Sequence, residues 1–270
     1  MDVLVCVQAV THEPPRLVAG EGAPRFERRG RSVLNESDAY ALDAAVALAR
    51  RTGGRVSAVT VGPLAAQEVL YLALAKGANE ALRVDAVAEP PLEVARVLAA
   101  VVRRGRYDLV LTGVESSEEL ASAVGPALAG FLDWPFASAV QSLEVDVGDG
   151  RARVERETGG GGRQQLSLAL PAVLCVQSGI CRLSYPPAVR VLQARRQATR
   201  SLAAAELGED DARGGRGLGG HGGVIGRGRA RSGEGLEFAC VNMFKKDLDA
   251  VAEAGRYWFE RVQLRPGRAP

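Results

Sequence analysis

At 270 residues, of which 47% are hydrophobic, the chain can bury one large core, or one core with an extension. Its formal net charge of +2 excludes nucleic-acid binding driven by bulk electrostatics. No apolar run approaches the length of a membrane span, and residues 1–8 begin a strand rather than a signal peptide. We therefore expect a cytoplasmic protein with no direct membrane insertion.

Cysteine and histidine usage gives no sign of a metal centre or of nucleophilic catalysis. The four cysteines form no CxxC pair, and Cys6 and Cys175 lie inside apolar runs, so we expect buried, reduced thiols. The two histidines, His12 and His221, fall in polar, irregular segments, which favours surface positions. The sequence therefore assigns no metal ligand and no catalytic residue.

The first half of the chain alternates short apolar runs with amphipathic ones. The apolar runs predict strands at residues 3–7, 56–61, 82–84, 109–111 and 136–140. Helices are predicted between them, from an Asn35 and Asp38 N-cap pair to Gly53, from Pro63 to Gly77, and over residues 91–104. Residues 9–34, rich in Pro, Gly and Arg, are expected to form an irregular surface excursion. This alternation predicts an α/β fold with a doubly wound, mostly parallel sheet.

The pattern changes after Gln141, where strands follow one another without helices. Strands predicted at 142–147, 152–157 and 165–170 form a β-hairpin excursion, and residues 172–176 predict a buried strand. A helix over about 189–196 ends a domain that we assign to residues 1–197. Residues 206–235 are rich in Gly and Arg and predict a flexible segment, and an amphipathic helix is predicted over 236–261. Residues 198–270 are therefore expected to form a C-terminal arm that docks on a partner subunit.

Residues 107–138 carry the strongest local signal of a binding site. The strand in this stretch ends at Gly113, and Ser116 and Glu119 follow at the spacing of a capping box. A helical pattern then continues through Leu128. A strand, a glycine turn and a capped helix place free backbone N–H groups at the carboxyl edge of a sheet, where α/β proteins bind nucleotides.

Several motifs, in order and at matching spacing, resemble those of the electron-transfer flavoprotein β subunit, also called the FixA family. The motifs are VLVCV, NESDAYALDAAV, SAVTVGPLAAQEVLYLALAKGANEALRV, YDLVLTG, GPALAGFLDWPFAS, VERETGGG and LPAVLCV. The resemblance covers residues 1–197. It implies a three-layer α/β domain of the adenine-nucleotide-hydrolase-like kind, and an electron carrier subunit rather than an enzyme with its own substrate.

The resemblance also implies cofactors and partners. FAD would lie mainly on an α subunit, and this subunit would hold AMP or a second FAD. The heterodimer would pass electrons between flavin dehydrogenases and a downstream acceptor, such as a membrane quinone oxidoreductase or a ferredoxin-type protein.

Matched residue by residue, the resemblance implies two sets of contacts. The nucleotide would contact Cys6, Asn35, Val61, Gly113, Ser116, Ser117, Ser122, Ala123, Val124 and Gly125. A partner would contact the loop over residues 178–185, through Ile180, Arg182 and Tyr185. In the family, an apolar side chain of this loop enters a pocket on the partner dehydrogenase.

This chain departs from the family pattern in its nucleotide-binding segment. A basic residue, a glutamine and a carboxylate of the family segment are missing here. The corresponding segment holds Val114, Glu115, Ser116, Glu118, Leu120 and Ala123. Near the first strand, Gln8 replaces a usual lysine. Glu118 and Glu119 would repel a phosphate unless a cation intervenes. Two interpretations therefore stay open, a retained nucleotide and an emptied site. An adenine-nucleotide-binding regulatory module of the same fold, without a redox role, is the alternative function.

Overall fold

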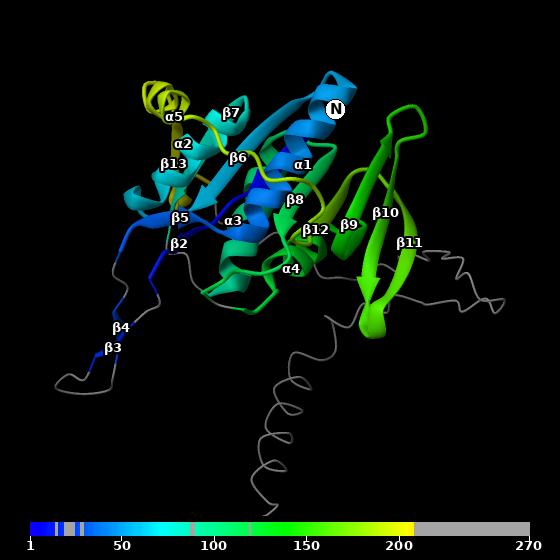
Figure 1. The fold of residues 1–270 in the computed structure, drawn as a ribbon, viewed down its shortest axis with the longest axis horizontal. Helices are drawn as coiled ribbons and strands as arrows, with labels where there is room; N and C mark the ends of the chain where they lie inside the picture. The colour runs from blue at the N-terminus through cyan, green and yellow to red at the C-terminus, as the bar shows by residue number, and fades with distance from the viewer. Residues whose placement is uncertain (14–15, 19–24, 28–29, 87–89, 119, 208–270) are drawn as a thin grey trace, which may run out of the picture.

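The structure is a computed structural model that describes residues 1–13, 16–18, 25–27, 30–86, 90–118 and 120–207 (Figure 1). The helix expected at 236–261, and all but the first two residues of the Gly/Arg-rich segment, lie outside the described residues. Within the described part of the chain, no helix combines the length and the apolarity that crossing a membrane requires.

A nine-stranded sheet forms the centre of the domain. Its strands are β1 (Asp2–Cys6), β6 (Arg55–Val61), β7 (Glu80–Asp85), β8 (Leu109–Gly113), β9 (Phe136–Asp146), β10 (Arg151–Thr158), β11 (Gly162–Ala169), β12 (Ala172–Val176) and β13 (Arg200–Ala203), in the order β11-β10-β9-β12-β8-β1-β6-β7-β13. Neighbouring strands are parallel along the row β9-β12-β8-β1-β6-β7-β13. At the other end of the sheet, β10 is antiparallel to both β9 and β11. The predicted mostly parallel sheet with a β-hairpin excursion is confirmed.

Helices cover both faces of the parallel part of the sheet, because side chains alternate between the two faces along each strand. Val3 and Val5 of β1 belong to the core formed with α1 (Glu36–Thr52) and α2 (Gln67–Lys76). Leu4, between them, belongs to the opposite core, formed with α3 (Pro91–Arg104) and α4 (Val124–Leu132). The result is a three-layer α/β domain, as predicted (Figure 1).

Short strands replace the irregular excursion that was expected over residues 9–34. β2 (Ala9–Thr11) pairs with β5 (Ser32–Leu34), and β3 (Arg16–Val18) pairs with β4 (Arg25–Glu27), both antiparallel. The expectation was wrong because strands of three residues show too little alternation of apolar and polar residues to be detected. Pairing with a partner strand, rather than a local pattern, defines these strands.

Strand β9 is continuous, where the sequence predicted separate strands at 136–140 and 142–147. Ala139 adopts a left-handed φ of 56°, and the register of β9 against β12 shifts between Leu174 and Val176. Such an irregularity bends a strand without ending it. The two predicted strands are therefore one element, whose first part joins the parallel sheet and whose second part starts the hairpin.

The sheet extends past residue 197, the boundary placed on the α/β domain from the sequence. After α5 (Ala188–Ala194), β13 pairs in parallel with β7. Arg83 of β7 donates from Nη2 to Ser201 Oγ at 2.9 Å. Leu207 follows in a short helical turn and is buried in the core that contains α3. Residues 200–207 thus pack as part of the domain.

The packing of Leu207 generates a prediction about stability. The side chain is 1% exposed, so Leu207→Ala should lower the free energy of unfolding by about 2–4 kcal/mol. The matched control, Leu192→Ala, removes a side chain that is 60% exposed and should change it by less than about 0.5 kcal/mol. Urea unfolding of the three proteins measures both values. Equal effects of the two substitutions would show that Leu207 is not a core residue.

Candidate functional site

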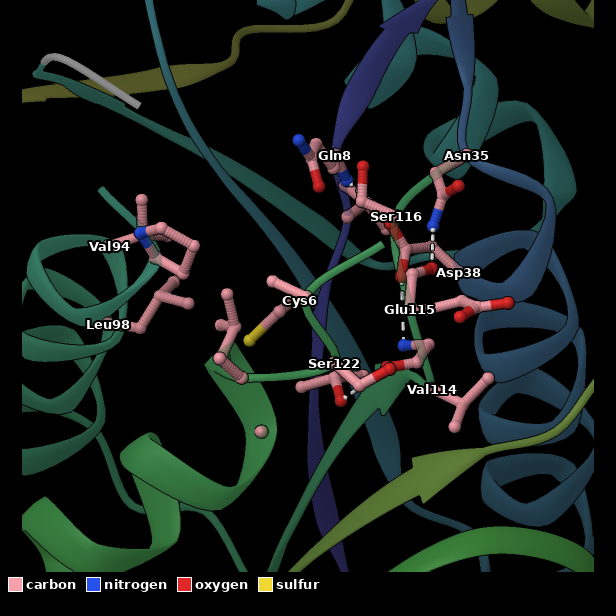
Figure 2. A pocket seen from close by; sticks show the side chains of 18 of the residues that line it. Cys6, Gln8, Asn35, Asp38, Val94, Leu98, Val114, Glu115, Ser116 and Ser122 are labelled. Atoms are coloured by element: carbon pink, nitrogen blue, oxygen red, sulfur yellow. Dashed lines mark hydrogen bonds between the residues drawn. The ribbon is translucent and has the colours of Figure 1, made fainter. Parts of the chain in front are cut away.

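A cavity that is partly open to solvent lies at the carboxyl edge of the sheet (Figure 2). The last residues of three adjacent parallel strands line it: Cys6 of β1, Val61 of β6 and Gly113 of β8. Val94 and Leu98 of α3 form an apolar wall on the side opposite α1 (Figure 2). Crevices at the carboxyl ends of the strands are where open α/β sheets bind ligands.

Nine of the ten residues predicted to contact a nucleotide line this cavity. They are Cys6, Asn35, Val61, Gly113, Ser116, Ser122, Ala123, Val124 and Gly125. The tenth, Ser117, is not among the lining residues, and its backbone N–H donates to Asn35 Oδ1 at 3.2 Å. Segments that are far apart in the sequence therefore meet around one cavity.

Asp38, in the first turn of α1, joins the ends of β1 and β8 beside the cavity. Its Oδ2 accepts the backbone N–H of Gln8 and its Oδ1 accepts that of Gly113, both at 2.8 Å. Burial raises the pKa of this carboxyl to about 6, and hydrogen bonds from Gln8, Gly113 and Asn35 oppose the rise only in part. Sequence reasoning missed this role, because no local pattern reveals a bond to an N–H group 75 residues away.

Asn35 holds the loop between β8 and α4, residues 114–123, which lines the cavity and is called the covering loop below. Its Nδ2 donates to the carbonyl oxygen of Glu115 at 2.8 Å and to Ser37 Oγ at 3.0 Å. Ser37 Oγ donates to the same carbonyl at 2.6 Å. Asn35 does precede α1, but its side chain makes no capping hydrogen bond. The predicted N-cap position of Asn35 is confirmed, whereas the side-chain capping bond is absent because Asn35 and Asp38 bind neighbouring strands or the loop instead.

The segment between β8 and α4 is a loop, where the capping-box spacing predicted the start of a helix. Leu120 and Ser122 adopt left-handed φ values of 51° and 47°, which a right-handed helix excludes, and α4 begins after them. Ser116 Oγ accepts the N–H of Glu118 at 3.2 Å and so forms only a local turn. The predicted helix start was therefore wrong, and Glu119 lies outside the described residues.

Glu118 binds the N-terminal excursion rather than the cavity. Its Oε1 accepts the backbone N–H of Thr11 at 2.6 Å and the Thr11 hydroxyl at 2.7 Å. The lining includes two acidic residues, Asp38 and Glu115, and no Lys, Arg or His of the described part of the chain. An anion in the cavity would therefore depend on backbone N–H groups. The first turn of α4 has such groups, because the first N–H groups of a helix lack intrahelical acceptors.

The two buried thiols beside the cavity serve packing. Burial raises the pKa of Cys6 above its ordinary value and that of Cys175 to about 11, so neither is a thiolate at neutral pH. Thr112 Oγ donates to Cys175 Sγ at 3.1 Å. A Cβ at Gly125 would lie 2.1 Å from the same sulfur, so the start of α4 can approach β12 only with glycine there. The predicted buried, unpaired thiols are confirmed for both cysteines.

The residues predicted to contact a partner lie between β12 and α5, away from the cavity lining. Ile180 is half-buried and packs against the core on the α1 side of the sheet. Arg182 is exposed, and Tyr185 is 85% exposed. Tyr185 therefore presents more apolar surface to solvent than Ile180 does. Across the described ranges, no cluster of three or more His, Cys, Asp or Glu residues is arranged to hold a metal ion.

Comparisons with known proteins place this architecture in a family. The Electron transfer flavoprotein domain family matches residues 25–207. A protein named electron transfer flavoprotein subunit beta, from Methylophilus methylotrophus, is 35% identical over 180 residues, which are 65% of this chain and 68% of that protein. The chain belongs to the electron transfer flavoprotein β-subunit family.

Other relatives carry the same name. The β subunit of Sus scrofa is 37% identical over 163 residues, which are 57% of this chain and 62% of that protein. The β subunit of Bacillus subtilis is 28% identical over 183 residues, which are 66% of this chain and 70% of that protein. The resemblance stated from sequence motifs is thus confirmed.

The buried carboxyl of Asp38 predicts how stability depends on pH. Its pKa in the folded protein, about 6, lies above its ordinary value of 3.8, so the folded state binds the proton more tightly. This contribution to stability is fully present below pH 3.8 and is lost as the pH rises through 6. Relative to Asp38→Asn, the wild type should lose on the order of 3 kcal/mol of unfolding free energy across this window. Urea unfolding of both proteins at a series of pH values measures the difference between their unfolding free energies. A wild type that gains stability relative to Asp38→Asn as the pH rises would contradict the assignment.

Proposed function

We propose that this chain is the β subunit of a heterodimeric electron transfer flavoprotein that passes electrons between flavin dehydrogenases and a downstream acceptor. The family match over residues 25–207 carries the proposal. The subunit acts as an electron carrier component, not as an enzyme with its own substrate. The proposed acceptor is a membrane quinone oxidoreductase or a ferredoxin-type protein, and the proposed compartment is the cytoplasm. No comparison favours a regulatory module without a redox role.

The cavity at the carboxyl edge is the proposed nucleotide site of this subunit. The apolar side chains of Val61, Val94 and Leu98 suit the adenosine part of AMP or of a second FAD. The backbone N–H groups of residues 122–125, at the start of α4, suit its phosphate, because the helix dipole favours an anion there. When bound, FAD supplies the redox chemistry, and we propose that the redox FAD lies mainly on the α subunit.

Hydrogen bonds of this chain's own residues support a retained site. Asp38 fixes the ends of β1 and β8, and Asn35 fixes the covering loop through the carbonyl of Glu115. Glu118, which the sequence suggested would repel a phosphate, directs its carboxylate to Thr11 instead. The cavity is thus framed by groups whose polar atoms are already satisfied, which limits the reorganisation that binding requires.

The partner subunit is proposed to bind the C-terminal part of the chain. Of the expected arm, 198–270, residues 200–207 pack on the α/β domain itself. Residues 206–235 have a Gly- and Arg-rich composition that buries little apolar surface on its own, and residues 236–261 have the pattern of an amphipathic helix. We assign them to docking on the α subunit.

Co-expression with an α-subunit gene tests the proposed function. The two chains should copurify with the visible absorption spectrum of a flavin, and denaturation of the complex should release an adenine nucleotide besides the redox FAD. Failure of the chains to copurify, or a colourless complex, would contradict the proposal.

A substitution that fills the cavity tests the nucleotide site. Ala123 lines the cavity in the covering loop, so Ala123→Trp should reduce copurified nucleotide by about tenfold or more, since a filled pocket excludes its ligand. Ala169→Trp, on an exposed position of β11, is the matched control and should retain nucleotide. Nucleotide released by denaturation is quantified by chromatography. Equal nucleotide content in the two variants would place the ligand elsewhere.

A second substitution tests the docking loop. Tyr185 is 85% exposed, so Tyr185→Ala should leave the melting temperature and the flavin spectrum unchanged. If the loop anchors a dehydrogenase, loss of a hot spot worth about 2 kcal/mol should slow reduction about 30-fold at sub-saturating concentrations. Val147→Ala, an exposed position on the hairpin, is the control. Stopped-flow reduction by the dehydrogenase measures the rates, and identical rates for both variants would exclude the loop.

A further inference from the structure

One carboxylate joins the covering loop to the N-terminal excursion. Oε1 of Glu118, in the covering loop, accepts the backbone N–H of Thr11 at 2.6 Å and the Thr11 hydroxyl at 2.7 Å. The two residues lie 107 positions apart in the sequence. Hydrogen bonds to a carboxylate are shorter and stronger than those between neutral groups, and both residues are half-buried, which limits competition from water. This contact is called the latch below.

The excursion gives the latch a fixed partner. Thr11 ends β2, which pairs with β5, and Thr11 itself lies opposite Ser32. β5 leads directly into Asn35, whose backbone N–H donates to the carbonyl oxygen of Gln8 at 3.0 Å. The two strands are therefore joined to each other and to the carboxyl edge of the sheet. Thr11 thus holds a defined position against the covering loop.

Other contacts hold the first half of the covering loop. The backbone N–H of Val114 donates to a carbonyl oxygen of β12 at 3.0 Å. The carbonyl oxygen of Glu115 accepts hydrogen bonds from the side chains of Asn35 and Ser37. Glu118 follows these residues in the sequence, and it is the anchored residue that lies nearest to the second half of the loop.

The second half of the loop is exposed and lines the cavity. Leu120 is 67% exposed, and Ala121 and Ser122 are exposed as well. Ala121, Ser122 and Ala123 belong to the lining, and Figure 2 shows Ser122 at the cavity. The left-handed φ values of Leu120 and Ser122 cost energy, so they persist only where surrounding contacts hold the chain. The anchor at Glu118 is such a contact, and its loss should let this half relax away from the cavity.

This exposed half contains groups that are assigned to the phosphate. The proposed phosphate contacts are the backbone N–H groups of residues 122–125, at the start of α4. Movement of the loop would displace the first two of these N–H groups and would open the cavity to solvent. Loop opening controls the release of bound molecules from many proteins. The strength of the latch should therefore set how fast a nucleotide leaves the cavity.

We propose that Glu118 is a positioning residue of the nucleotide site, whose bonds to Thr11 keep the covering loop closed and slow the release of the nucleotide. Glu118 is not among the residues that line the cavity, so it acts through the loop. This inference rests on the proposed function, under which an adenine nucleotide occupies the cavity. Charge alone gives the opposite expectation, because a carboxylate near a phosphate weakens binding by repulsion. A carboxylate that holds the loop strengthens binding instead.

The rate at which AMP leaves the full-length chain tests the proposal. Radiolabelled AMP is bound, an excess of unlabelled AMP is added, and rapid filtration follows the label that stays on the protein. Glu118→Ala removes both bonds of the latch and should release AMP about tenfold faster than the wild type. Glu118→Gln keeps a carbonyl oxygen that accepts hydrogen bonds, so its release rate should stay within about threefold of the wild type. Under repulsion, both substitutions would slow release.

Further variants separate the latch from other effects. Thr11→Val removes the hydroxyl but keeps the N–H group, and it should speed release about threefold. Combined with Glu118→Ala it should add nothing, because the latch is already broken. Glu144→Ala removes an exposed carboxylate from β9 and is the matched control, which should release AMP as the wild type does. Melting temperatures check that the variants fold. Without nucleotide, the Thr11 amide should exchange its hydrogen faster in Glu118→Ala than in the wild type.

Four results would overturn this inference alone. They are release from Glu118→Ala that is no faster than from the wild type, release from Glu118→Gln that is as fast as from Glu118→Ala, effects of the Thr11 and Glu118 substitutions that add in full, and equal exchange of the Thr11 amide in the wild type and Glu118→Ala. A wild type that binds no AMP would overturn AMP as the ligand of the cavity, and this inference with it. Failure of the proposed site and failure of the latch are therefore distinguishable.

Discussion

The carboxylate of Asp38 is the interaction on which the functional end of the molecule depends. It accepts the N–H groups of Gln8 and Gly113 and so joins the first turn of α1 to the ends of β1 and β8. Gly113 admits this approach because a Cβ there would lie 2.4 Å from Asp38 Oδ1. The covering loop begins directly after this bond, and residues of this loop line the cavity. The protein thus buries a group whose charge costs stability in order to fix the geometry of its sheet edge.

The sequence predicted those parts of the fold in which local pattern and tertiary structure agree. The buried strands, the helices on both faces and the turn at Gly113 follow from apolar and amphipathic runs, whereas Cys6 and Val61 were expected at the site from the family resemblance. The start of α4 was wrong, because Ser116 meets the spacing of a capping box while the backbone turns left-handed before the helix begins. The strands β2 to β5 were missed because each has only three residues, too few to show an alternating pattern.

Two concave surfaces with no lining residue in common result from this fold, the cavity at the carboxyl edge and a hollow between α1, α2 and the segment that leads into α5. The cavity at the carboxyl edge has carboxyl groups and no basic side chain in its lining, so its attraction for a phosphate rests on backbone N–H groups. The hollow beside α5 carries three arginines without partners in the described part of the chain, together with exposed apolar side chains. The same helix, α1, supplies Asp38 to the first and Arg50 to the second.

An NMR titration of the isotope-labelled chain with AMP tests the nucleotide site most directly. Gly113, Ser122 and Gly125 line the cavity, so their amide signals should shift with AMP concentration along a single saturable curve. Ser184 lies outside the cavity lining and donates its amide N–H to Asp43, so its amide signal should not shift. No shift at any concentration, or shifts confined to residues outside the cavity, would contradict a retained nucleotide site at the carboxyl edge.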